Sequence, residues 1–187
     1  MDQHTSDQSL ATLFHHRWNV PTLISLLDQG TGRVVVLLNR LGVSRNGLKA
    51  TLTALDELGL ASPNPGYGHP LRPEIVLTDR GGRVATACAL YAEALTDPSL
   101  MSRKWTASVM FELDTCSHFN ELQHRLDVSP RSLSMMLREL VGAGLVLREV
   151  EAGHPPRSRY TLSTKGSDVS HAARSIAHML IARSQPR

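Results

Sequence analysis

An internal repeat constrains this chain more than any other feature. When the 187-residue sequence is shifted by 85 positions, residues 40–81 align with residues 125–166 without a gap, and 15 of the 42 aligned positions are identical. Chance would give about three identities at this composition. Trp18 aligns with Trp105 at a shift of 87, so a two-residue length difference lies near residues 29–33. The sequence therefore predicts a duplicated fold, joined at residues 96–99.

The second copy carries clear helix signals. Apolar residues at helical spacing predict a helix over residues 104–114, and Ser117 is a candidate N-cap for a helix that runs through Arg125. Ser129-Pro130 suits the start of the next helix, because proline at the first helical position gives up no hydrogen bond that is needed. We expect this helix to end before Gly144 and to bury one face, formed by Leu133, Met136, Leu137 and Leu140.

Two predicted strands and a last helix follow. Residues 145–151 and 158–163 read as a hairpin around a loop at residues 152–157, and residues 164–183 read as a helix. The first copy repeats this order, but we expect a loop instead of its first wing strand, because Pro63 and Pro65 cannot donate ladder hydrogen bonds. The order of elements predicts winged helix-turn-helix modules.

The predicted fold class is mainly α with small β wings. Two tandem winged helix-turn-helix modules, residues 10–95 and 99–183, would form a pseudo-dimer within one chain. Their terminal helices, about residues 78–95 and 164–183, should pack on each other, because their apolar content exceeds what one small module buries. The residues expected at this contact are Val84, Leu90, Tyr91 and Leu95 on one helix and Val169, Ile176, Met179 and Leu180 on the other.

Composition and charge favour a nucleic-acid partner over membrane, metal-dependent or catalytic functions. The net charge is +3, and the whole excess lies in residues 96–187, which hold 12 basic and 9 acidic residues. Seventeen of the 20 basic residues are arginine, whose guanidinium suits phosphate and guanine. No long apolar run or signal peptide is seen, so we expect a cytoplasmic protein without membrane contact. The spacing of Cys88 and Cys116, and of the histidines, indicates no disulfide, metal or cofactor, and no catalytic motif is recognised.

The second copy resembles the HxlR-type winged helix-turn-helix regulators, which are related to the MarR group. The matching strings are residues 104–106, 118–122 and 128–134, and above all the wing string Pro155-Pro156-Arg157-Ser158-Arg159-Tyr160-Thr161-Leu162-Ser163. The resemblance implies a DNA-binding regulator that dimerises through its terminal helices. Several relatives sense oxidants through a cysteine near the N-terminus, but no cysteine precedes Trp18, which puts that mode of sensing in doubt.

The predicted DNA-contacting residues come from both copies. On the second recognition helix, Arg131, Met135 and Arg138 lie opposite the buried face, and Ser129, Ser132 and Ser134 lie near its positive N-terminal end. The corresponding helix of the first copy offers Ser44, Arg45, Asn46 and Lys49, and Arg72 and Arg157 lie beside the two wing tips. The simpler interpretation of these exposed residues is a solvated helix face. A second alternative is that the first copy no longer binds DNA and serves only in dimerisation.

We therefore expect a sequence-specific DNA-binding transcription regulator, and a repressor in particular, rather than an enzyme. The partner would be double-stranded DNA. A small-molecule effector and a further homodimer are both left open. The alternative is a winged-helix module for protein interaction with little or no DNA binding, which the net neutrality of residues 1–95 favours.

Overall fold

The first half of the chain, residues 10–95, combines helices with a small antiparallel sheet. The computed structural model describes residues 10–29, 32–64, 74–95, 97–153 and 156–181. After a helical turn at residues 10–13 come α2 (Asn19–Gln29), β1 (Gly32–Arg33), α3 (Val34–Leu41), α4 (Arg45–Glu57), β2 (Ala61–Pro63), β3 (Glu74–Leu77) and α5 (Asp79–Ala94). The sheet has the order β1-β3-β2.

The second half, residues 97–181, repeats this order of helices around a two-stranded sheet. Its elements are η1 (Pro98–Ser102), α6 (Thr106–Glu112), α7 (Phe119–Leu126), α8 (Pro130–Gly142), β4 (Val146–Glu151), β5 (Arg157–Leu162) and α9 (Thr164–Ile181). As expected, Ser129 caps α8 by accepting a hydrogen bond from the Ser132 N–H, and Gly144 follows the helix with a positive φ of 70°. The four predicted core residues of α8 are buried.

The passage from hairpin to last helix is built identically in the two halves. The hydroxyls of Thr78 and Ser163 donate to the carbonyls of Gly59 (2.8 Å) and Gly144 (2.7 Å). Each hydroxyl also accepts from the N–H three residues further on, at Gly81 or Gly166. A Cβ on Gly81 would lie 1.7 Å from the Leu60 carbonyl oxygen, and one on Gly166 would lie 2.0 Å from that of Leu145. Only glycine allows the helix to approach the strand this closely.

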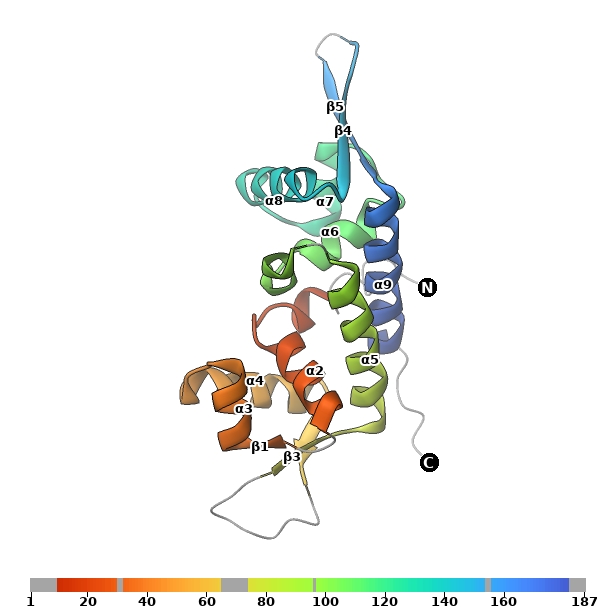
Figure 1. Cartoon of the computed structure of the whole chain (residues 1–187). Helices are drawn as coiled ribbons and strands as arrows, with labels where there is room; N and C mark the ends of the chain where they lie inside the picture. The colour runs from red at the N-terminus through yellow and green to blue at the C-terminus, as the bar shows by residue number, and fades with distance from the viewer. Residues whose placement is uncertain (1–9, 30–31, 65–73, 96, 154–155, 182–187) are drawn as a thin grey trace.

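Helices α5 and α9 join the two halves. They pack along each other, while α2 packs on α5 and α6 packs on α9. Figure 1 shows α5 and α9 side by side in opposite directions, with the two helix-turn-helix regions toward opposite ends of the pair. At the start of α5, Arg80 donates hydrogen bonds to the carbonyls of Met179 and Leu180 at the end of α9, and to that of Leu58. The expected contact between the terminal helices is thus present.

One residue expected at this contact is not part of it. Val84, Tyr91 and Leu95 are buried on α5, but Leu90 is 57% exposed. The buried face of α5 follows helical periodicity through residues 84, 88, 91 and 95, and position 90 lies about 100° away from position 91. On α9, Val169, Ile176 and Leu180 are buried, and Met179 packs against the core from a partly exposed position.

The prediction of a loop in place of the first wing strand is wrong, because the structure has a strand there. Residues 61–63 form β2 and pair with β3, although Pro63 lies in the strand. Hydrogen bonds run from the Thr78 N–H to the Leu60 carbonyl and from the Asn64 N–H to the Glu74 carbonyl. In antiparallel alternation, Pro63 then occupies a position whose amide points away from β3, on an edge strand. The missing N–H therefore costs no ladder bond.

Ser117 does not cap α7, contrary to the expectation. The helix begins at Phe119, and His118 occupies the N-cap position without a side-chain cap. The reason is tertiary: the Ser117 carbonyl accepts a hydrogen bond from the Tyr160 N–H (2.8 Å), and His118 forms a β-bridge with Arg159. Residues 117–118 are held as extended chain against the wing, at the place where the first half has β1.

Candidate nucleic-acid interface

The outer face of α8 is the centre of the candidate interface. Arg131, Ser134, Met135 and Arg138 are exposed, and Met135 alone leaves 52% of its surface to solvent. Arg131 and Arg138 form no ion pair with any residue that the structure describes. A large apolar side chain between two free guanidinium groups suits a DNA major groove, where arginine reads guanine and an apolar group touches the thymine methyl.

The two serines at the start of α8 have local roles. The Ser129 hydroxyl caps the helix and donates to the Ser132 hydroxyl (2.8 Å), so both side chains hold the N-terminal turn together. Ser129 is exposed and Ser132 is partly exposed. The turn thus stays open to an anion at the positive end of the helix dipole, where phosphates bind in other proteins.

The wing and the two helices of the second half meet around one cavity. A cavity of about 790 Å³ is lined by residues of α7, α8 and β5, and it brings Ser134 and Arg157 together with His118 and Asn120. On β5, Arg157 and Arg159 are both exposed and lie two positions apart, so they project from the same face of the strand. Arg157 has no ion pair within the described residues, whereas Arg159 lies 3.6 Å from Glu151.

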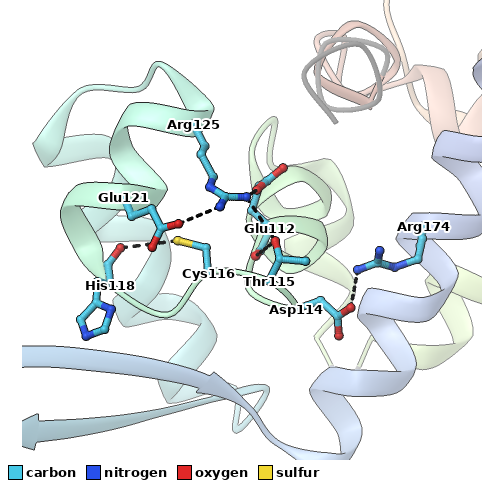
Figure 2. Close-up of polar contacts among 8 residues, drawn as sticks. All are labelled: Glu112, Asp114, Thr115, Cys116, His118, Glu121, Arg125 and Arg174. Atoms are coloured by element: carbon cyan, nitrogen blue, oxygen red, sulfur yellow. Dashed lines mark hydrogen bonds and ion pairs between the residues drawn. The ribbon is translucent and has the colours of Figure 1, made fainter. Parts of the chain in front are cut away.

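A polar network fixes α7 against α6 (Figure 2). Arg125 donates to the nearly buried carboxylate of Glu112 at 3.2 Å and to Glu121 at 2.7 Å. Hydrogen bonds from the Cys116 thiol and from Arg125 lower the pKa of Glu121, and Glu121 in turn raises the pKa of Arg125. Arg174 of α9 pairs with Asp114 at 2.5 Å. These bonds connect the helix-turn-helix to the helices that join the two halves.

The Cys116 thiol belongs to this network and is not a poised nucleophile. Burial, followed by its hydrogen bond to Glu121, raises its pKa to about 11. The side chain is 3% exposed and its sulfur lies 3.9 Å from the His118 carbonyl oxygen. Its burial and raised pKa therefore make this thiol poorly reactive.

In the first half, the predicted contact residues lie at the start of α4. Ser44 caps the helix by accepting from the Gly47 N–H (3.1 Å), as Ser129 does for α8. Arg45, Asn46 and Lys49 are exposed on the helix. The groove-facing positions that hold Arg131, Met135 and Arg138 in α8 hold Asn46, Ala50 and Thr53 here. Arg72, the predicted wing contact, lies outside the described residues.

Sequence reasoning missed two candidates that the structure adds, Asn120 and Arg159. Asn120 shares the cavity with Ser134 and Arg157, which only the packing of α7 on the wing brings about. Arg159 could have been found from the period of two along the predicted strand, since it shares a face with Arg157. The two aligned tryptophans, Trp18 and Trp105, both pack against the core, each beneath a neighbouring cation, Arg17 at 4.7 Å and Lys104 at 4.6 Å.

Comparison with known families finds a match in the second half. The family model described as "HxlR-like helix-turn-helix" matches residues 100–183. This part of the chain is therefore similar to HxlR-like helix-turn-helix domains. The matched residues contain α8, the wing and α9, and hence all predicted contact residues from Ser129 to Arg157.

Two curated relatives carry matching names. An uncharacterized HTH-type transcriptional regulator of Methanothermobacter thermautotrophicus is 40% identical over 68 residues, which are 35% of this chain and 52% of the relative. The uncharacterized HTH-type transcriptional regulator YvaP of Bacillus subtilis is 36% identical over 69 residues, 36% of this chain and 64% of the relative. The chain thus spans between half and two thirds of the length of these relatives.

Two solved structures are also similar to part of the chain. A transcriptional regulator of the MarR family from Enterococcus faecalis V583 matches with 34% identity and a TM-score of 0.39, over 50% of this chain and 81% of that one. A transcription factor from Pseudomonas aeruginosa matches with 26% identity and a TM-score of 0.38, over 51% and 65%. In the part of the chain that the structure describes, no helix is both long and apolar enough to traverse a bilayer.

Proposed function

We propose that this protein is a DNA-binding transcription repressor that reads an operator with two unequal winged helix-turn-helix modules, residues 10–95 and 99–183. The observation that carries the proposal is a set of exposed arginines on α8 and β5 that form no ion pair with any described residue, namely Arg131, Arg138 and Arg157. Other arginines of the second half, such as Arg103, Arg125 and Arg174, have carboxylate partners. The names of the curated relatives, HTH-type transcriptional regulators, support the same class.

The antiparallel contact of α5 and α9 supports an intrachain pseudo-dimer. It sets the two helix-turn-helix regions toward opposite ends of one helix pair, so that both can approach one duplex. The operator should then consist of two half-sites whose centres lie about 10–11 base pairs apart. Because α4 and α8 differ at every groove-facing position, the half-sites should be similar but not palindromic.

Selection of bound duplexes from a random pool, followed by titration of the selected DNA, tests the proposal. Six to eight phosphate contacts should weaken binding by about two to four orders of magnitude between 50 and 200 mM salt. The variant with both Arg131→Ala and Arg157→Ala should lose specific binding. Arg83→Ala, which removes an exposed charge from α5, is the control and should bind like the parent chain.

The alternative function, a docking module for proteins, predicts a different outcome. Selection would then enrich no sequence, and any residual binding to DNA would be weak, independent of sequence and abolished as the salt concentration rises. If the double arginine variant retained the selected specificity, the assignment of the second module as the principal reader would be wrong.

A further inference from the structure

The outer surface of α3 is apolar where its counterpart α7 is polar. Val35 is 64% exposed and Val36 is 40% exposed. The aligned residues of α7 are Asn120 and Glu121. Solvent-facing positions of a surface helix ordinarily hold polar residues. Both valines thus leave a large part of their surface uncovered by the described chain, at positions where the second half has polar residues.

These valines belong to a cavity between α3 and α4. The cavity has a volume of about 720 Å³, and its apolar walls are formed by Val34, Val35, Val36, Leu38, Leu48 and Leu52. A concave, mainly apolar site of this size, with few polar groups, is typical of sites for small molecules. It lies on the outer side of the first half, where no other segment of the described chain covers the valines.

The polar groups of the lining are cationic. Arg33, Arg45 and Lys49 reach the cavity, together with the uncharged Thr53, and the lining contains no acidic residue. All three cations are exposed, and none forms an ion pair within the residues that the structure describes. Three unpaired positive charges beside an apolar cavity complement a ligand that joins an apolar body to an anionic group.

The repeat provides an internal comparison. The positions aligned with Arg33, Arg45 and Lys49 hold His118, Pro130 and Ser134, so the second half lacks all three cations. The cavity beside α7 in the second half is closed by the wing instead, and its lining holds Glu121 as well as Arg157, so a carboxylate offsets the cation there. Within the described residues, the valine walls and the three cations occur together in the first half.

We propose that the cavity between α3 and α4 binds a small apolar organic anion, a carboxylate on an aromatic or branched aliphatic body. Arg45 and Lys49 are also candidate DNA contacts of α4. Ligand and operator DNA would compete for them, and each would weaken the affinity of the other by the same factor. The binding claim stands on the cavity alone, and the competition rests on the proposed function.

Calorimetric titration of the full chain with naphthoate, in the absence of DNA, tests the binding claim. We expect saturable binding of one naphthoate per chain, and affinity at least about tenfold lower for the neutral naphthylmethanol, because it lacks the charge that the cations recognise. Lys49→Met and Val36→Glu should each reduce the naphthoate affinity by about tenfold or more. The matched controls Arg83→Met and Val150→Glu, at exposed positions on α5 and β4, should leave it unchanged.

The unfavourable outcomes are distinct. Equal affinity for naphthoate and its alcohol, or unchanged affinity in both cavity variants, would overturn the anion site. Binding of an acidic amphipathic peptide without binding of naphthoate would replace it with a protein groove. Titration of the selected DNA in the presence of saturating naphthoate tests the competition separately. If the chain binds naphthoate but no DNA, the site stands and the proposed function fails.

Discussion

The two helix-turn-helix regions share a scaffold but present different surfaces. Both second helices begin at a serine N-cap, Ser44 or Ser129, and both bury leucines at aligned positions. Toward solvent, the second half offers Arg131, Met135 and Arg138, whereas the first half offers Asn46 and a cavity walled by valines. Core and capping residues are alike in the two copies and residues that face outward are not, so the shared fold does not require the two surfaces to bind the same ligand.

The largest expected effect is on stability, at two glycines that occupy the same place in both halves. Gly81→Ala and Gly166→Ala should each lower the free energy of unfolding by about 3 kcal/mol, because the new Cβ would collide with a strand carbonyl and separate the last helix from its wing. Gly82→Ala, where a Cβ meets nothing within 4 Å, is the control and should stabilise α5 by up to about 1 kcal/mol. Urea unfolding measures all three. Costs that differ widely between Gly81 and Gly166 would break the structural equivalence of the halves.

The next effect is on operator binding, through the outward-facing residues that differ between α8 and α4. Arg131→Ala should weaken binding to the selected operator by about 1–3 kcal/mol and relax specificity at one base pair. Asn46→Ala should cost less, because α4 has no arginine on its groove-facing stripe. Titration of the operator and of single-base variants measures both. A symmetric operator, or equal losses for the two variants, would show that the halves read DNA alike.

A smaller effect on stability is expected from replacing Arg125 and Arg40, which occupy aligned positions in the two halves. Arg125→Met leaves the Glu112 carboxylate, 4% exposed, without its cation, and should cost about 1–2 kcal/mol of stability, since Arg125 itself is one-third exposed. Arg40→Met removes an exposed pair with Asp28 at 2.6 Å and should cost less than about 0.5 kcal/mol. Thermal unfolding of the two variants decides whether the network of Figure 2 is specific to the second half.

The same network predicts a pH dependence. The pKa of Glu121 is lowered in the folded chain, so the unfolded chain binds a proton more readily. The stabilisation is present above the ordinary glutamate pKa of about 4.5 and is lost as the pH falls through the lowered value. Glu121→Gln should therefore flatten the decline of stability in acid. An unchanged acid limb in urea titrations at several pH values would argue against this role for Glu121.

The smallest expected effect is the difference in alkylation rate between the two thiols, Cys88 and Cys116. Burial raises the pKa of Cys88 to about 12, and burial and Glu121 raise that of Cys116 to about 11. Both thiols should resist iodoacetamide in the native protein, and Cys116 should react first, because Cys88 is fully buried and Cys116 lies in a turn at the edge of the core. Mass spectrometry of alkylated peptides measures the order. Rapid labelling of Cys116 at neutral pH would instead indicate a reactive thiol.

The sequence by itself determined the features that depend on neighbours along the chain. Helical periodicity placed the core residues of α8, serine before the first turn marked Ser129 as the N-cap, and Gly144 marked the end of the helix. The same periodicity placed Arg131, Met135 and Arg138 on the solvent side, where the structure has them. These signals act over a few residues, so they can be read without knowledge of the rest of the fold.

Only the tertiary structure decided the features that join distant segments. The wing holds residues 117–118 extended and so moves the start of α7 to Phe119, and an edge position lets Pro63 remain in a strand. The packing of α3 on α4 turns two valines outward and places them beside Arg45 and Lys49. Each of these outcomes depends on which segment lies alongside, and a local pattern of apolar and polar residues does not specify that neighbour.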